Sequence, residues 1–235
     1  MSQEKMFALD ERVITRKDCF DSLDATRSYD LDIRKSMLIP MERVSMAVGN
    51  QVSEGDKVLE VGCSTGLVSL MISSAVQGCE IIGVDDNENR LQVANENAQI
   101  ASVLNSGSAV EFKCVDNMAK LPFADNSMDI VFSYGKLRTL PDPEVIGVLK
   151  EMKRVCKEDG LVYIYDIARD AEEGMIATIL QYSGKSGDKF GEEIKAAFTT
   201  SEMQAILQKA ELTDWTVALD RKNDVNMVIT NKELK

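Results

Sequence analysis

A glycine turn near residue 60 has the residue types and spacing best suited to binding a ligand. Residues 58–61 form an apolar run typical of a short buried strand, and residues 67–72 have the apolar spacing of a helix. Between them, Gly62 permits a sharp turn and Gly66 permits close approach of helix and strand, which leaves the first helical amides free. Glu60 adds negative charge at the end of the strand. We therefore expect strand, turn and helix to form a ligand site.

The spacing of the glycines favours one class of ligand over another. A dinucleotide site requires Gly-x-Gly-x-x-Gly, with pyrophosphate on the helix N-terminus. Here the spacing is Gly-x-x-x-Gly with Ser64 between the glycines, and Glu60 would repel pyrophosphate. The turn instead suits a ligand that carries an ammonium and a sulfonium. It resembles motif I, Glu-x-Gly-x-Gly-x-Gly, of class I S-adenosylmethionine-dependent methyltransferases, with Ser64 replacing the middle glycine. A turn with two purely structural glycines is the alternative.

Length and composition exclude several other functions. The chain has 235 residues, enough for one large α/β domain, and its net charge of −12 disfavours nucleic acid as a partner. It contains no histidine, so His-based metal sites and His-activated nucleophiles are absent, and we predict no metal site. Five cysteines form no Cys-x-x-Cys pair and are expected to be small buried thiols. With no membrane-length apolar run and no apolar signal region, we expect a cytoplasmic protein.

The second predicted strand, residues 79–85, ends in two acids. Asp85 and Asp86 are followed by Asn87, which can cap a helix that begins at Glu88. An acid at the end of this strand, about twenty residues beyond the glycine turn, is placed to accept hydrogen bonds from ribose hydroxyls. Asp85 therefore indicates an adenosine ligand, without separating S-adenosylmethionine from NAD.

The segment after the third predicted strand, residues 110–115, strengthens the resemblance. It reads Asp-Asn-Met at 116–118 and Leu-Pro-Phe-Ala-Asp-Asn-Ser-Met-Asp-Ile-Val at 121–131. This is similar to Gly-Asp-Ala…Leu-Pro-Phe-x-Asp-x-Ser-Phe-Asp-x-Val of the same family. The resemblance implies that Asp116 meets the adenine amino group and that the backbone of Asn117 and Met118 borders the ring. It also implies a turn at Asp125 and a capping or orienting role for Asp129.

The fourth strand is expected to end at Ser133 and to lead into a polar loop. Asp142 is a natural N-cap and Pro143 a natural first residue for a helix over 144–157. Asp159 and Gly160 then predict a turn into a fifth strand, 161–167. This run resembles the family's Leu-x-x-Leu-Pro-Asp-Pro…Glu-x-x-Arg-Val-Leu-Lys-Pro-Gly-Gly segment. Lys136 and Arg138 stand where the family often has polar or histidine residues.

Segments on either side of this region are more individual. Helical spacing over 17–52 predicts two or three helices, which in the resembling family cap the cofactor pocket; Tyr29 and Arg34 are its polar candidates. Residues 168–200 are expected to hold a helix and then a flexible loop at 183–188, as a substrate lid or a simple surface excursion. Thr199-x-x-Glu202 is a capping box, and 214–219 with 225–230 predict a hairpin with a polar turn around 223–224.

Together these patterns predict a doubly wound, Rossmann-like α/β fold. The expected division is a helical cap over 1–52 and a cofactor-binding domain over 53–235, with 168–200 as a possible lid insertion. The resemblance implies seven strands in the order 3-2-1-4-5-7-6, the last one antiparallel.

The expected function is methyl transfer from S-adenosylmethionine to a small molecule, mainly by proximity and alignment. The resembling group includes ubiquinone and menaquinone biosynthesis enzymes; the acceptor and its reacting atom stay open. The predicted cofactor-binding residues are Glu60, Gly62, Cys63, Ser64, Gly66, Asp85, Asp86, Asp116, Asn117, Met118 and Ser133. If a proton must be removed from the acceptor, the bases to test first are Tyr134, Lys136 and Asp166, although polar residues at strand ends more often only face water.

Three other functions remain open at this point. A catalytically silent S-adenosylmethionine-binding protein would bind cofactor without turnover. A protein methyltransferase could use the acidic surface to dock a basic partner. A nicotinamide oxidoreductase is disfavoured by Glu60 and by the glycine spacing.

Overall fold

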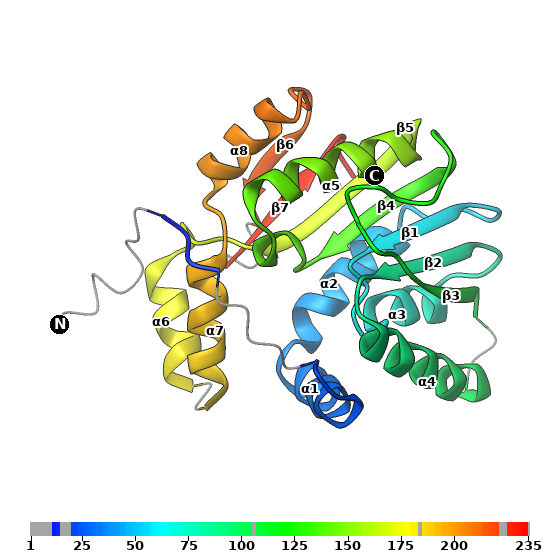
Figure 1. Ribbon diagram of the computed structural model, residues 1–235, viewed down its shortest axis with the longest axis horizontal. Helices are drawn as coiled ribbons and strands as arrows, with labels where there is room; N and C mark the ends of the chain where they lie inside the picture. Colours follow the sequence, from blue (N-terminus) through cyan, green and yellow to red (C-terminus); the bar gives the residue numbers. More distant parts are fainter. Residues whose placement is uncertain (1–10, 15–19, 105–106, 183–184, 221–224, 235) are drawn as a thin grey trace.

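The computed structural model describes residues 11–14, 20–104, 107–182, 185–220 and 225–234. Its centre is a seven-stranded sheet in the order β3-β2-β1-β4-β5-β7-β6 (Figure 1). The β5–β7 and β7–β6 pairs are antiparallel and the others are parallel, so the predicted fold and strand order are confirmed. The strands are β1 (Lys57–Val61), β2 (Glu80–Asp85), β3 (Ala109–Cys114), β4 (Met128–Tyr134), β5 (Cys156–Ile167), β6 (Thr216–Leu219) and β7 (Asn226–Thr230).

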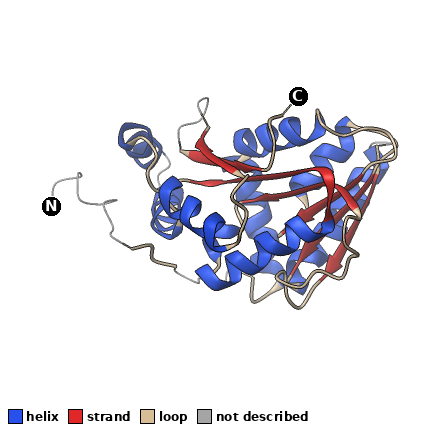
Figure 2. Cartoon of the chain, turned by 90° about the horizontal axis from the view of Figure 1, so that it is seen from above, coloured by secondary structure: helices blue, strands red, loops and turns tan. Residues whose placement is uncertain are grey.

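Helices cover both faces of this sheet (Figures 1 and 2). On one face, α2 (Leu38–Gly49) packs against α3 (Leu67–Ala75), and α4 (Glu88–Leu104) lies beside α3. On the other face, α5 (Asp142–Val155) packs against α8 (Thr200–Lys209). The central strands are buried from both sides, which is why their sequences are continuous apolar runs. This arrangement places the carboxyl ends of β1, β2, β4 and β5 along one edge of the sheet.

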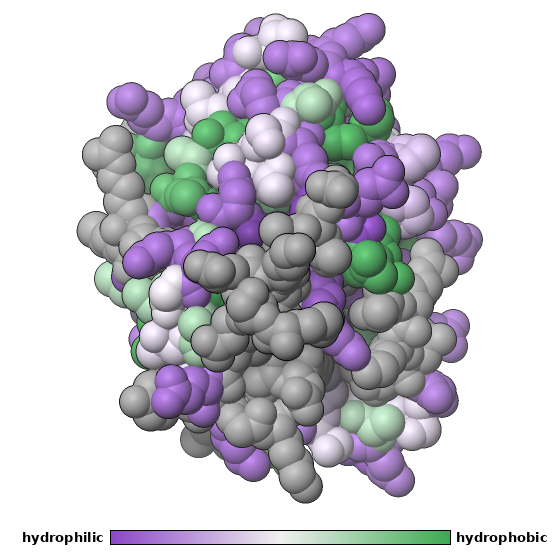
Figure 3. All heavy atoms as spheres, turned by 90° about the vertical axis from the view of Figure 1, so that its left-hand side faces the viewer, coloured by the Kyte–Doolittle hydropathy of each residue, from purple (hydrophilic) through white to green (hydrophobic). Residues whose placement is uncertain are grey.

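Four further elements lie around that edge. Helix α1 (Leu23–Ser36) packs on α4, and the short helix η2 (Leu137–Thr139) follows β4. Helices α6 (Glu173–Tyr182) and α7 (Lys185–Ala196) lie side by side at the left of Figure 1. Hydrophilic side chains prevail over the described part of that face (Figure 3). Within the described ranges, no helix combines the length and the apolar character needed to cross a membrane.

Three local predictions differ from the structure. Pro141 is the N-cap of α5 and Asp142 its first residue, so this helix begins two residues earlier than predicted and ends at Val155. The predicted turn at Asp159 and Gly160 lies inside β5, because Cys156 already pairs with Met128 before a register shift. Residues 185–188 were predicted to form part of a loop, but they belong to α7. Further along this helix, Ile194 is buried in the core. The remaining loop residues, 183–184, and the polar turn at 223–224 lie outside the described residues.

The other predicted elements are confirmed. Two helices precede the sheet in the described part of the chain, α1 and α2. Thr199 and Glu202 form the full capping box of α8. The terminal hairpin is β6 with β7.

Candidate active site

The glycine turn is fastened to the end of β2 by backbone hydrogen bonds. The amides of Gly62 and Cys63 both donate to the carbonyl oxygen of Val84, at 2.8 and 2.9 Å. Gly62 and Ser64 have left-handed backbones, with φ of 81° and 50°. The amide of Ser64 donates to the Asp85 carboxylate at 2.9 Å. The turn is therefore held in one shape without any ligand, and α3 begins directly after it, as predicted.

Gly66 is required by packing as well as by the turn. Its φ is 78°, and a Cβ placed there would lie 2.3 Å from the ring of Phe112 on β3. Phe112 thus fills the space that the glycine leaves beneath α3. This contact joins the turn to β3. The sequence predicts only a close approach of helix and strand at Gly66, so the contact with Phe112 is an additional finding.

Glu60 is directed into the protein. Glu60 is only 2% exposed, and its carboxyl accepts hydrogen bonds from the amide and the hydroxyl of Ser69, at 3.2 and 2.5 Å. Burial raises the pKa of Glu60 to about 8, in spite of the two bonds from Ser69, which lower it. Glu60 therefore caps the first turn of α3 from the neighbouring strand. Sequence reasoning missed this role, and a contact of Glu60 with a ligand stays a prediction.

The two acids after β2 differ in accessibility. Asp85 is fully buried, and besides Ser64 it accepts hydrogen bonds from the amide of Asn87 and from Arg90 at 3.2 Å. Burial raises the pKa of Asp85, while Arg90 opposes that shift. The side chain of Asp86 is 43% exposed. Asp85 thus shapes the turn, and Asp86 is the acid that a ligand can reach; a ribose contact by either stays a prediction.

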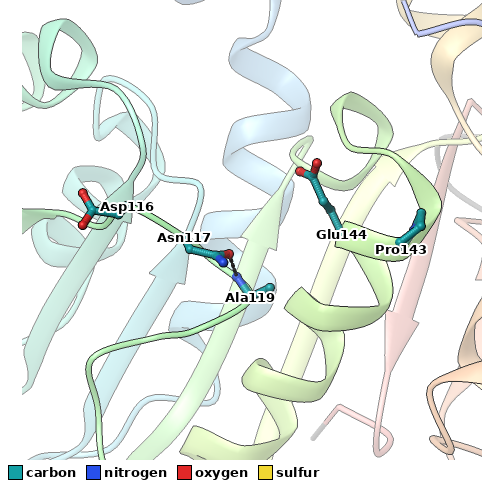
Figure 4. A pocket seen from close by; sticks show the side chains of 5 residues that line it. All are labelled: Asp116, Asn117, Ala119, Pro143 and Glu144. Carbon is teal, nitrogen blue, oxygen red and sulfur yellow. Dashed lines mark hydrogen bonds between the residues drawn. The ribbon is translucent and has the colours of Figure 1, made fainter.

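The loop after β3 borders an open hollow of about 450 Å³ (Figure 4). Asp116, Asn117 and Ala119 lie on one side, and Pro143 and Glu144 of α5 on the other. The Asn117 side chain accepts the amide of Ala119 at 2.8 Å, which fixes the loop. Met118 is buried in the core, so only its backbone can border a ligand. Asp116 is exposed, and its predicted contact with adenine stays a prediction.

The end of β4 lies against the glycine turn. Ser133 is fully buried, and its hydroxyl donates to the carbonyl oxygen of Val61 at 2.7 Å. The ring of Tyr134 stacks on Tyr165 of β5, with 6.4 Å between the ring centres. Burial raises the pKa of Tyr134 well above its ordinary range. The Ser133 side chain therefore ties two strands together, and Tyr134 keeps its proton at neutral pH.

Asp166, at the end of β5, is paired with Arg138. The guanidinium donates to one carboxylate oxygen at 2.8 Å and the Arg138 amide donates to the other at 3.1 Å. Arg138 also lies 3.6 Å from Glu193 on α7. The neighbouring Arg12 donates to carbonyl oxygens of Arg138 and of Ala196, each at 3.2 Å. The pair thus links the strand ends to α7, and the base role predicted for Asp166 stays a prediction.

Lys136 follows β4 and reaches back across the turn. Its ammonium lies 3.3 Å from both carboxylate oxygens of Asp86. Its stem packs on Gly62, where an added Cβ would come within 2.6 Å of Lys136 Cγ. A protonated, paired amine has no lone pair to accept a proton, so the base role predicted for Lys136 requires this pair to break.

Helix α1 supports the turn through a buried acid that sequence reasoning missed. Asp30 accepts hydrogen bonds from Arg34 at 2.7 Å and from Asn97 of α4 at 3.1 Å. Asn97 also donates to the carbonyl oxygen of Thr65, in the turn, at 2.9 Å. Tyr29 is half-buried and edge-on to Phe20. Arg34 is exposed, and the pocket roles of Tyr29 and Arg34 stay predictions.

A family comparison assigns the region just described. Residues 58–160 match the model of a methyltransferase domain. This segment is similar to known methyltransferase domains, in line with the resemblance of its motifs to class I S-adenosylmethionine-dependent methyltransferases. It contains the glycine turn, both acids after β2 and the loop after β3, so the resemblance first seen in short motifs extends through the four strands β1 to β4 and into β5. The cofactor of such a domain is S-adenosylmethionine.

Individual relatives agree with the methyltransferase domain. The chain is 41% identical over 114 residues to the demethylmenaquinone methyltransferase of Staphylococcus aureus, which corresponds to 47% of this chain and 43% of that protein. The chain thus spans under half the length of this relative in the match. A protein of Methanococcus maripaludis assigned to the S-adenosylmethionine-dependent methyltransferases has a similar fold, with 17% identity, a TM-score of 0.68, and coverage of 94% and 96% of the two chains. A methyltransferase structure of Aquifex aeolicus gives 18% identity, a TM-score of 0.62, and coverage of 89% and 97%.

The residues around the turn of the methyltransferase domain fit this cofactor. The hydroxyl oxygen of Ser64 is buried and has no hydrogen-bond partner among the described residues, so it is available to a ligand. Asp86 and Asp116 offer accessible carboxylates to a ligand that carries positive charge and hydroxyl groups.

Proposed function

We propose that this protein transfers the methyl group of S-adenosylmethionine to a small-molecule acceptor. The observation that carries the proposal is the position of the preformed glycine turn. It lies between β2 and β4, at the point where the strand order reverses, and ligands of doubly wound folds bind at that point. S-adenosylmethionine supplies, when bound, a methyl group on a positively charged sulfonium.

In this scheme, the residues of the chain bind and orient the cofactor and the acceptor. The Ser64 hydroxyl receives the methionine part, Asp86 with Asp85 behind it receives the ribose, and Asp116 receives the adenine. Ser133 keeps the end of β4 against the turn, which aligns the acceptor side with the cofactor side. Proximity of this kind supplies a large part of the rate enhancement of group transfer.

No strong general base is required by this proposal. Tyr134 is buried and keeps its proton, Asp166 is held by Arg138, and Lys136 is held by Asp86. An acceptor that is already nucleophilic at neutral pH fits this arrangement better than one that must first be deprotonated. Tyr134, Lys136 and Asp166 are proposed to shape the acceptor side, with any proton leaving to water.

The α6–α7 insertion is our candidate wall of the acceptor site. Arg138 joins it to the end of β4 through Glu193, and the amide of Val13 donates to the carbonyl oxygen of Lys195 at 2.9 Å. The insertion is therefore fixed beside the strand ends, where a lid would exclude water from the transfer. We propose the same division that the sequence suggests, with residues 1–52 as a helical cap over the domain.

Binding tests the cofactor part of the proposal. Calorimetric titration with S-adenosylmethionine, S-adenosylhomocysteine and NADH should show binding of the two adenosyl compounds and not of NADH. Asp116→Ala should weaken the binding of both adenosyl compounds by about 10- to 100-fold, the usual effect of losing a charge-assisted hydrogen bond. Asp125→Ala, an acid of the same segment placed in the turn before β4, is the matched control and should leave affinity unchanged. Binding of NADH alone would refute the proposal and favour an oxidoreductase.

Transfer tests the acceptor class. The S. aureus relative is named for demethylmenaquinone, so demethylated quinones are the first acceptors to incubate with methyl-labelled cofactor. Label in the organic extract supports a small-molecule acceptor. Label in a protein band of a lysate would indicate a protein methyltransferase instead. Cofactor binding with no label transferred to either fraction would indicate a silent binding protein.

We also propose a cytoplasmic location. Cys63, Cys79 and Cys156 are buried free thiols, a state that a reducing compartment maintains. Cys114 is a free thiol as well but is exposed, and Cys19 lies outside the described residues.

A further inference from the structure

Helix α4 holds the glycine turn from the side of the helical cap. The side-chain amide of Asn97, on this helix, donates to the carbonyl oxygen of Thr65 at 2.9 Å and to the carboxylate of Asp30 on α1 at 3.1 Å. Thr65 is 2% exposed and Asp30 is 5% exposed, so both hydrogen bonds end on residues that water hardly reaches. One amide group therefore connects a buried acid of the cap with the backbone of the turn.

The carbonyl that Asn97 holds belongs to a strained part of the turn. Thr65 lies between two residues with left-handed backbones, Ser64 with a φ of 50° and Gly66 with a φ of 78°. A left-handed backbone is unfavourable for serine and persists only where the surroundings impose it. Asp85 holds the amide of Ser64, and Asn97 holds the carbonyl oxygen of the next residue. Two side chains from outside the turn thus fix its shape.

This shape matters because it directs a polar group that has no partner. The hydroxyl oxygen of Ser64 is buried and accepts or donates no hydrogen bond among the described residues. Its direction follows from the left-handed backbone of Ser64, which changes if the adjoining Thr65 peptide rotates. A hydroxyl that already has the right direction binds a ligand more strongly, because no ordering has to accompany binding.

Helix α4 makes a second connection of the same kind. Arg90 precedes Asn97 by seven residues, or two helical turns, so the two lie on the same face of α4. Arg90 donates to Asp85 at 3.2 Å and lies over the ring of Phe20 at 3.7 Å. This face of α4 therefore lies between the turn and the segment that precedes the sheet. Asn97 is the residue of the pair that contacts the turn backbone itself.

We propose that Asn97 is a positioning residue for the cofactor, which holds the glycine turn in its binding shape while Asp30 of α1 is docked. This inference rests on the proposed function. Asp30 acts through Asn97, because the hydrogen bond that it accepts fixes the amide in the orientation that donates to Thr65. Docking of α1 thus raises cofactor affinity by way of the turn. Since such coupling is reciprocal, cofactor binding also strengthens the docking of α1.

A double-mutant cycle tests the inference, with the dissociation constants of S-adenosylmethionine and S-adenosylhomocysteine measured by calorimetry. Asn97→Leu removes both hydrogen bonds at similar side-chain size and should weaken binding of both compounds by about tenfold. Asp30→Leu should weaken binding by about threefold in wild type and should have no further effect once residue 97 is changed. Asp30→Asn keeps an oxygen that accepts from Asn97, so its affinity should stay within about twofold of wild type.

The matched control is Arg27→Met. Arg27 of α1 pairs with Glu96 of α4 at 2.7 Å, and its side chain is 46% exposed. This pair joins the same two helices at the surface, so its loss should leave both dissociation constants unchanged. If Asn97→Leu does not fold, Asn97→Ser serves in its place, because the shorter side chain reaches neither acceptor.

Hydrogen exchange provides a second readout. S-adenosylhomocysteine should raise the protection of α1 amides in wild type and should raise it less in Asn97→Leu, because the link to the turn is missing. An equal rise in the two proteins would contradict the coupling.

Unchanged dissociation constants in Asn97→Leu overturn the inference and leave the proposed function intact, because wild type still binds. Additive losses in the double variant also overturn it, since Asp30 would then act independently of Asn97. A loss in Arg27→Met equal to that in Asp30→Leu would overturn it as well, because docking of α1 would then act by another route. Failure of wild type to bind either compound overturns the inference together with the proposed function.

Discussion

The acids at the ends of β1 and β2 are held differently from the acid at the end of β5. Glu60 receives hydrogen bonds from Ser69, and Asp85 receives them from two backbone amides and from Arg90, all close by in the sequence. Asp166 also receives hydrogen bonds from two backbone amides and from an arginine, Arg138, but that arginine comes from the loop after another strand, 28 residues away. Glu193, which belongs to the α6–α7 insertion, lies on the other side of that arginine.

This difference shows which of these contacts depend on segments that are distant in the sequence. The turn and its acids lie within residues 60–90, and the methyltransferase domain model covers all of them. The Arg138 pair draws on α7 and on Arg12, both outside that match. The contacts of Glu60 and Asp85 are thus made within a short stretch of sequence, whereas those around Arg138 are assembled from segments far apart in the sequence.

The largest expected effect comes from breaking the Arg138 pair. Arg138→Met leaves Asp166 buried without a cation, which should lower the free energy of unfolding by about 3–5 kcal/mol. Chemical denaturation measures this loss. Lys57→Met, which breaks the exposed pair with Glu80 at 3.5 Å, should cost less than about 1 kcal/mol. Equal losses in the two variants would show that the Arg138 pair is no more than a surface contact.

A smaller effect is expected from Glu60, and it depends on pH. Its pKa in the folded protein is about 8, above its ordinary 4.5, so between these values the folded state holds a proton that the unfolded state has released. The stability of the wild type should therefore fall as pH rises from 6 to 8, by about 2 kcal/mol, and Glu60→Gln should remove this part of the slope. Unfolding at several pH values measures it. The exposed acid Glu144, changed to Gln, should leave the slope as in wild type; a wild-type slope in Glu60→Gln would contradict the assignment.

The smallest effect concerns the N-terminal caps of two helices, α3 and α8. Helix α3 starts at Gly66 without a side-chain cap of its own, whereas α8 starts with Thr199, whose hydroxyl accepts the amide of Glu202 at 3.1 Å. Thr199→Ala should cost about 1 kcal/mol, and Thr199→Ser should restore most of it. Hydrogen exchange should find the loss in α8 and not in α3. A loss of hydrogen-exchange protection in both α3 and α8 would contradict the view that the two helices are stabilised separately.

The strands and the glycine turn could be predicted because their signals are local. Burial on both faces produces apolar runs, and a left-handed turn calls for glycine, so β1, β2 and the turn follow from short stretches of sequence. The seven-strand order came from family resemblance. The start of α7 at Lys185 was missed because Ser and Gly residues indicate a loop unless packing of the helix outweighs them.

The partners of the site residues could not be predicted. Glu60 was expected to face a ligand, but its partner is Ser69 on the following helix. Lys136 and Arg138 are separated by a single residue, yet their side chains diverge, one toward Asp86 and the other toward Asp166. Such choices depend on which acid lies within reach after the strands have assembled, and no spacing in the sequence records that distance.

The contacts of Arg12 have a consequence for the order of synthesis. Arg12 leaves the ribosome early, but its partners Arg138 and Asp142 follow some 130 residues later, and Ala196 follows 184 residues later. The hydrogen bonds within residues 60–90 can therefore form on the nascent chain before this arginine has its partners. Closing so long a loop is slow, and docking of the segment around Arg12 should be among the last steps of folding.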